Sequence, residues 1–183
     1  MHESAMKSAA LFFKTYAKYK DSGTVVDIGS QDVNGSLKTA CPERFKYVGV
    51  DFQKAQNVDV ILNDPYKLPF ADQSVDIVVS SSCLEHAEFF WLTWLEMLRI
   101  TKPDGLIYIN VPSDGQHHAY PIDAWRFRID AATSLMNWGN RNGYPVRLLE
   151  AYVDAEPPWK DFVGIYVGDE AHVPMYPDRI PML

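Results

Sequence analysis

The sequence predicts an α/β protein built on one mostly parallel β-sheet, and three observations support this fold class. Short runs of β-branched and aliphatic residues alternate with segments of helical periodicity, as in a series of βαβ units. Several of these runs end in an aspartate or in a turn that contains glycine. The last two runs, 146–153 and 162–167, have no helix between them, so we expect an antiparallel ribbon at one edge of the sheet.

Size and charge limit the possible functions. A chain of 183 residues, 47% of them hydrophobic, fits one domain with a sizeable core. We expect that domain to span 1–183, with an N-terminal helix in 1–23, a core in 24–168 and a tail in 169–183. The net charge of −7, with no run of Lys or Arg, argues against a nucleic-acid partner.

No part of the sequence has the pattern of a membrane or secretion segment. No apolar run approaches the roughly 20 residues that span a bilayer, and the N-terminal part contains no signal-peptide core. Cys41 and Cys83 are too few for a disulfide framework or a zinc site. We therefore expect a cytoplasmic protein without a membrane partner.

The first half of the chain begins with a helix and a buried strand. Residues 4–20 form an amphipathic pattern, which we interpret as a helix covering one edge of the sheet rather than lying on a membrane. The strand 24–26 leads through Asp27 into a turn at Gly29. After this turn a helix should begin at Ser36, a favourable N-cap.

Further strands are predicted at 45–50, 58–62 and 75–80. The link between the first two is too short for a crossover helix, so a turn should replace it. The remaining elements are a helix at 88–101, a strand at 106–111, a loop at 112–129 and a helix from Asp130 to Asn142. The helix at 88–101 is apolar on more than one face, so either another element of this chain or a second subunit should cover it. Something should also hold the proline-rich tail in place.

Acidic residues follow three consecutive strands of the predicted sheet. Asp51 lies about twenty residues beyond the Gly29 turn, where a carboxylate can accept both hydroxyls of a ribose. Asp64 can accept from an exocyclic amine such as that of adenine, and Phe52 can pack on the ring. Because ligands of open α/β sheets bind at the carboxyl ends of the strands, Asp27, Asp51 and Asp64 together indicate a nucleoside site.

From Val25 to about Gly143 the chain resembles the class I S-adenosylmethionine-dependent methyltransferases, and most closely their type 11 branch. The order and spacing of several segments carry this resemblance: 25–30, 47–51, 63–70, 75–86 and 98–106. It implies a Rossmann-like, doubly wound seven-stranded sheet, mostly parallel with an antiparallel last strand. It also implies S-adenosylmethionine as cofactor and S-adenosylhomocysteine as product.

The same resemblance assigns a cofactor set. Asp27 and Gly29 would meet the methionine end, Asp51 the ribose and Asp64 the adenine. The full set is Asp27, Gly29, Ser30, Asp51, Phe52, Asp64, Ser82 and Leu84. One position departs from the family pattern, because Gln31 stands where a second glycine is usual. The loop from Gln31 to Gly35 should therefore be longer and shaped by Asp32 and Asn34.

The loop at 112–129 is the predicted acceptor site, since long ordered loops in compact domains are often functional. Candidate general bases are His117 and His118 in this loop and His86 after the fourth strand. By the resemblance, Glu85 and His86 lie at the border between cofactor and substrate; the alternative is that they hold the start of the next helix. Candidate substrate contacts are Tyr120, Asp123, Trp125 and Arg126. Tyr120 and Trp125 either stack on the acceptor or anchor the loop, and Arg126 either binds an anionic group or pairs with Asp123. The adjacent side chains of His117 and His118 should diverge, which argues against a metal site.

The sequence therefore predicts a methyltransferase that acts on a small molecule or sugar. The run Tyr120–Phe127 looks like one found in methyltransferases of bacterial glycan and secondary-product assembly, which favours O-methylation of a carbohydrate. The alternative is a methyltransferase-shaped binding or scaffold protein without turnover. Nucleic-acid methylation fits the negative charge poorly, and either a monomer or a homodimer is expected.

Overall fold

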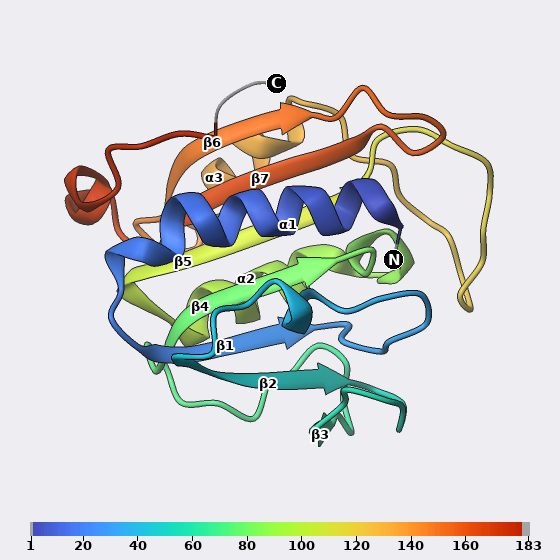
Figure 1. The fold of residues 1–183 in the computed structure, drawn as a ribbon, viewed down its shortest axis with the longest axis horizontal. Coiled ribbons are helices and arrows are strands. Elements are labelled where there is room, and N and C mark those ends of the chain that lie inside the picture. Colours follow the sequence, from blue (N-terminus) through green and yellow to red (C-terminus); the bar gives the residue numbers. More distant parts are fainter. Residues whose placement is uncertain (1, 181–183) are drawn as a thin grey trace.

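Seven strands form one sheet in the computed structural model, which describes residues 2–180 (Figure 1). Their order is β3-β2-β1-β4-β5-β7-β6. The strands are β1 (Gly23–Ile28), β2 (Phe45–Asp51), β3 (Val60–Ile61), β4 (Val75–Ser81), β5 (Thr101–Pro112), β6 (Arg147–Val153) and β7 (Asp161–Val167). The helices are α1 (Glu3–Tyr16), α2 (Phe90–Ile100) and α3 (Ala131–Arg141), with 3-10 turns η1 (Ala17–Tyr19), η2 (Leu37–Thr39), η3 (Leu84–His86) and η4 (Glu170–Met175).

The pairing of the strands confirms the predicted fold class. Strands β3, β2, β1, β4 and β5 run parallel to one another, whereas β7 runs antiparallel to both β5 and β6. The antiparallel ribbon of β6 and β7 therefore closes one edge of the sheet, as expected. The link between β2 and β3 contains no helix, which confirms the predicted turn there.

Helices cover both faces of the sheet (Figure 1). On one face α2 and α3 pack together, and the buried indole of Trp94 donates a hydrogen bond of 2.9 Å to the Leu135 carbonyl. Cover from within the chain thus buries one face of α2, whereas Leu92 stays 40% exposed and Phe90 and Trp91 line an apolar groove. On the other face α1 lies over β5 and β7, with the ring of Phe12 centred 4.8 Å from that of Tyr108. The prediction that this helix covers an edge was wrong, because its apolar stripe is wide enough to bury Phe12 and Tyr16 completely.

The predicted helix after Gly35 is the main error in the element assignment. Ser36 does act as a cap, accepting from the Lys38 N–H at 3.2 Å, but only the single turn η2 follows. Pro42 explains this, since a proline disfavours helical geometry at the residue before it.

The C-terminal segment is held by its own domain. Tyr176 is fully buried, and its hydroxyl donates to the Asp104 carbonyl at 2.5 Å. The Ile180 N–H donates to the Glu150 carboxylate at 3.0 Å. The last part of the predicted tail, 181–183, lies outside the described residues. Within 2–180, no helix combines the length and apolar character needed to cross a membrane.

Candidate functional site

A cavity of about 690 Å³ opens at the carboxyl ends of the parallel strands. Its walls come from the turn after β1, the end of β2, the segment after β4 and the loop between β5 and α3. That loop runs beyond the tips of the parallel strands (Figure 1). Parallel strands bring these segments together because all their carboxyl ends meet at one edge of the sheet.

The turn after β1 requires glycine at one position. Gly29 has a φ of +79°, and a Cβ there would lie 2.5 Å from the Sγ atom of Cys83. The N–H groups of Gly29 and Ser30 both donate to the Val50 carbonyl, at 2.9 and 3.2 Å. Asp32 then shapes the next part of the loop by accepting from the Gly35 N–H at 2.8 Å. This turn places the backbone of Gly29 in the cavity wall.

Asp51 is the strand-end acid that lines the cavity. It is the last residue of β2, its side chain lies at the cavity wall, and one carboxylate oxygen accepts from the Gln53 N–H at 3.2 Å. Phe52 follows with 45% of its surface exposed and forms the adjacent wall. An acid beside an accessible aromatic ring can hold two hydroxyls and a flat heterocycle.

Asp27 and Asp64 do not line this cavity, so the three acids do not share it. The carboxylate of Asp27 is buried and accepts a hydrogen bond of 2.5 Å from the Tyr47 hydroxyl. Burial raises the pKa of Asp27 to about 7, and the charge of Asp51 adds to this while the Tyr47 bond opposes it. Asp64 is exposed and accepts from the Tyr66 N–H at 2.9 Å.

Of the other predicted cofactor residues, Ser82 lines the cavity, whereas Ser30 and Leu84 do not. Ser30 turns to the Asn57 carbonyl, to which its hydroxyl donates at 3.2 Å, and Leu84 is buried in the core. Ser82 lines the cavity, and its buried hydroxyl has no hydrogen-bond partner among residues 2–180. Because an unpaired buried hydroxyl is costly, this atom fits a position that a bound ligand completes.

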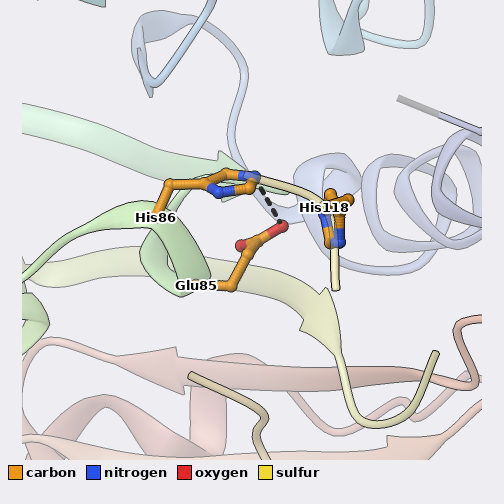
Figure 2. A group of neighbouring side chains, drawn as sticks. All are labelled: Glu85, His86 and His118. Atoms are coloured by element: carbon orange, nitrogen blue, oxygen red, sulfur yellow. Dashed lines mark ion pairs between the residues drawn. The ribbon is translucent and has the colours of Figure 1, made fainter. Parts of the chain in front are cut away.

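Two histidines and a buried glutamate meet at the side of the cavity beneath the loop (Figure 2). Glu85 is fully buried, and its Oε1 lies 3.6 Å from Nε2 of His86. The ring of His118 packs edge-on against that of His86 with centroids 5.0 Å apart. Burial raises the pKa of Glu85 to about 8 and lowers that of His86, so burial favours the neutral form of each group.

The remaining loop residues lock the loop to the domain. Asp123 accepts from both the guanidinium of Arg126 and the His118 N–H, so the internal ion pair is the alternative that the structure shows. The indole of Trp125 donates to the Ala87 carbonyl at 2.9 Å, and its ring lies in a second, apolar groove between α2 and α3. Trp125 therefore anchors the loop. Tyr120 lines the main cavity, whereas His117 is exposed and does not.

Trp159 and His2 are among the residues of the cavity wall that were not predicted. Trp159, in the turn between β6 and β7, has its ring centred 4.4 Å from that of His118. Its carbonyl also accepts from the N–H groups of Ser113 and Asp114, which ties this turn to the loop. The two prolines before Trp159 were a signal for an ordered aromatic turn. His2 stacks on Trp159 at 5.6 Å, and no sequence pattern pointed to it.

Comparison with protein families gives one match, to the methyltransferase domain, over residues 16–109. An uncharacterized methyltransferase of Mycobacterium tuberculosis (strain H37Ra) is 54% identical over 43 residues, which make up 24% of this chain and 17% of that protein. One of Mycobacterium marinum is 51% identical over 85 residues, 44% of this chain and 31% of that protein. The chain thus matches less than a third of the length of each of these relatives.

Solved structures share the fold at low sequence identity. The 1,6-didemethyltoxoflavin-N1-methyltransferase of Burkholderia thailandensis, solved with its substrate and S-adenosylhomocysteine, has a TM-score of 0.68 at 15% identity, covering 92% of this chain and 80% of that one. The YcgJ protein of Bacillus subtilis has a TM-score of 0.64 at 14% identity, covering 90% and 99%. The [4+2]-cyclase SpnF has a TM-score of 0.59 at 16% identity, covering 81% and 60%.

Proposed function

Because the chain belongs to the methyltransferase domain family, as its resemblance to the type 11 branch predicted, we propose that its cavity binds S-adenosylmethionine and transfers the methyl group to a small molecule or sugar. One observation carries this proposal: a single cavity at the carboxyl ends of the strands contains both Asp51 and the pair His86 and His118. Asp51 suits a ribose, and the histidines suit a polar acceptor.

The residues at the Asp51 side fit the cofactor. In this proposal Asp51 accepts from the ribose hydroxyls, Phe52 packs on the adenine, and the hydroxyl of Ser82 gains the partner that it lacks. Gly29 lets the backbone approach the ligand closely. Asp27, Ser30, Asp64 and Leu84 belong to the supporting structure around the cavity.

The chain's main catalytic task is positioning. S-adenosylmethionine supplies a methyl group on a positively charged sulfur, which is an activated leaving group. The cavity walls then align the acceptor with that methyl and exclude water. An acceptor hydroxyl must also lose its proton, and His86 or His118 is the proposed base that takes this proton. His117 does not line the cavity and has no part in this role.

The acceptor class follows from the wall opposite the strand ends. Tyr120 lines the cavity, is 51% exposed and provides an aromatic face on which a sugar or a flat ring can stack, whereas Trp159 is packed against His2 and His118. The solved toxoflavin enzyme with a bound small substrate supports an acceptor of this size, and the loop resemblance favours a sugar hydroxyl. The cytoplasmic location and the choice between monomer and homodimer stay predictions.

A methyl-transfer assay tests the proposal. The full chain would be incubated with S-adenosylmethionine labelled in its methyl group and with panels of sugars, nucleotide sugars, phenols and small acids. We expect label transfer to at least one hydroxyl compound and a large loss of transfer in His118→Ala, with His117→Ala unchanged. Binding of S-adenosylhomocysteine without transfer to any of the panels would contradict the proposed acceptor class, and absence of binding would favour the scaffold alternative.

A further inference from the structure

Glu85 is an unusual buried residue directly behind the cavity wall, next in the chain to His86, which lines the cavity. Its side chain is fully buried, and neither carboxylate oxygen has a hydrogen-bond partner within the described part of the chain. The 3.6 Å to Nε2 of His86 is too long for a hydrogen bond. A buried carboxylate without a partner is among the costliest arrangements in a protein, which indicates that something else completes it.

The hydrogen bonds of His86 prepare one of its nitrogens to bind a cation. Nδ1 lies 2.6 Å from the Ile122 carbonyl oxygen, and a carbonyl only accepts, so Nδ1 carries the proton. Nε2 therefore presents its lone pair on the side of Glu85 (Figure 2). A backbone carbonyl that fixes the tautomer in this way is the usual second partner of a metal-binding histidine.

His118 brings a third ligand from the loop. One ligand atom from each of Glu85, His86 and His118 lies within 4.8 Å of the others. The nearby positive charge of Arg126 favours the charged form of Glu85, but the guanidinium bonds to Asp123, at 2.7 Å for one contact, and not to Glu85. The prediction of no metal site considered only His117 beside His118, whereas these ligands come from two separate segments.

We propose that Glu85, His86 and His118 bind one divalent transition-metal cation, Zn²⁺ or Mn²⁺, at the wall of the cavity. Two imidazoles and one carboxylate form a ligand set that leaves a coordination position open. Bonds of about 2.0–2.2 Å require the ligand atoms to approach one another. Rotation of the His118 side chain provides this movement, since the ring is partly exposed while the backbone of His118 stays bonded to Asp123.

The proposed cation would also take part in the proposed methyl transfer, and only this catalytic role rests on the proposed function. Its open position faces a cavity that His86 and His118 line, so it binds the acceptor hydroxyl and lowers the pKa of that hydroxyl. The two histidines then act as ligands in place of the base proposed above, and the proton of the bound hydroxyl passes to solvent water. Cation binding itself needs neither cofactor nor acceptor.

Metal binding to the full chain tests the proposal without any activity measurement. The protein would be stripped with EDTA, dialysed and titrated with Zn²⁺ and with Mn²⁺ by calorimetry, with Co²⁺ absorption as a spectroscopic readout of nitrogen ligation. We expect one equivalent of Zn²⁺ or Mn²⁺ to bind with a Kd in the micromolar range or below. Glu85→Gln and His118→Gln should each weaken binding at least tenfold, and the neighbouring His117→Gln should leave it unchanged.

Two ligand variants, Glu85→Gln and His118→Gln, are used so that the test can be interpreted even if one of them does not fold. Gln fits the buried site of Glu85 without a charge, and His118 is partly exposed, so at least one variant should fold. Binding of neither ion, or binding that His117→Gln weakens as much as His118→Gln, overturns the metal site. Either result leaves the cofactor proposal intact, because S-adenosylhomocysteine binding is measured separately in EDTA.

Discussion

The hydroxyl of Tyr47 donates a hydrogen bond of 2.5 Å to the carboxylate of Asp27, and this contact joins β1 to β2 inside the protein. Asp27 is therefore a buried structural acid next to the cavity, while Asp51 is the acid within it. The two carboxylates repel each other, so the charge of Asp51 adds to the effect of burial in raising the pKa of Asp27.

Replacing Asp27 with Asn should change how stability depends on pH. Burial raises the pKa of Asp27 from 3.8 to about 7, so the folded protein binds more protons than the unfolded chain in this interval. The free energy of unfolding of the wild type should consequently fall as pH rises from about 4 to 7. Asp27→Asn removes this contribution, and its stability relative to the wild type should rise over the same interval by about 1–4 kcal/mol.

Urea denaturation at several pH values measures this difference. The comparison between variant and wild type is the relevant quantity, since other buried acids titrate in both proteins. A stability difference that does not change between pH 4 and pH 8 would show that Asp27 is not a protonated buried acid. Tyr47→Phe provides a control that keeps the ring and removes only the donor to Asp27.

Gly29→Ala should damage the turn that forms the cavity wall. The new Cβ would lie 2.5 Å from Cys83 Sγ at a φ of +79°, so we expect a loss of about 2–4 kcal/mol in unfolding free energy and weaker cofactor binding. Gly143→Ala is the matched control, because its φ is +89° but no atom of residues 2–180 lies within 4 Å of the added methyl. That variant should lose only about 1 kcal/mol. Equal losses in the two variants would contradict the importance of the Cys83 contact.

Tyr176 should contribute strongly to stability although it lies near the C-terminal end of the described residues. Its ring is fully buried and its hydroxyl bonds to the Asp104 carbonyl, so Tyr176→Ala should cost about 3–5 kcal/mol in thermal or urea unfolding. Tyr176→Phe removes only the hydroxyl and should cost about 1 kcal/mol. If Tyr176→Ala unfolds at the wild-type midpoint, the segment is not part of the cooperative fold.

Local patterns were enough to predict the sheet and much of the cavity. Buried strands such as β1 and β4 have hydrophobic runs with clear ends, and the absence of a helix between β6 and β7 determined their antiparallel pairing. Gly29, Asp51, Phe52 and Ser82 line one cavity because strand ends meet in a parallel sheet, and their role in cofactor binding stays a prediction.

Long-range contacts account for what could not be predicted. The direction of the Asp27 side chain depends on Tyr47, a partner twenty positions away in the chain. Trp159 joined the site only through the packing of the loop, which no local pattern describes. The helix expected after Gly35 depended on a good N-cap, and the effect of Pro42 outweighed that signal.

Calorimetric titration of S-adenosylhomocysteine tests the central claim most directly. The wild type, Asp51→Asn and Asp64→Asn would be compared in buffer with EDTA; Asp64 is the matched strand-end acid outside the cavity. We expect one-to-one binding to the wild type, at least tenfold weaker binding to Asp51→Asn, about 1.4 kcal/mol or more, and less than a threefold change in Asp64→Asn. No binding to the wild type, or equal affinity in Asp51→Asn, would contradict a cofactor site at the end of β2.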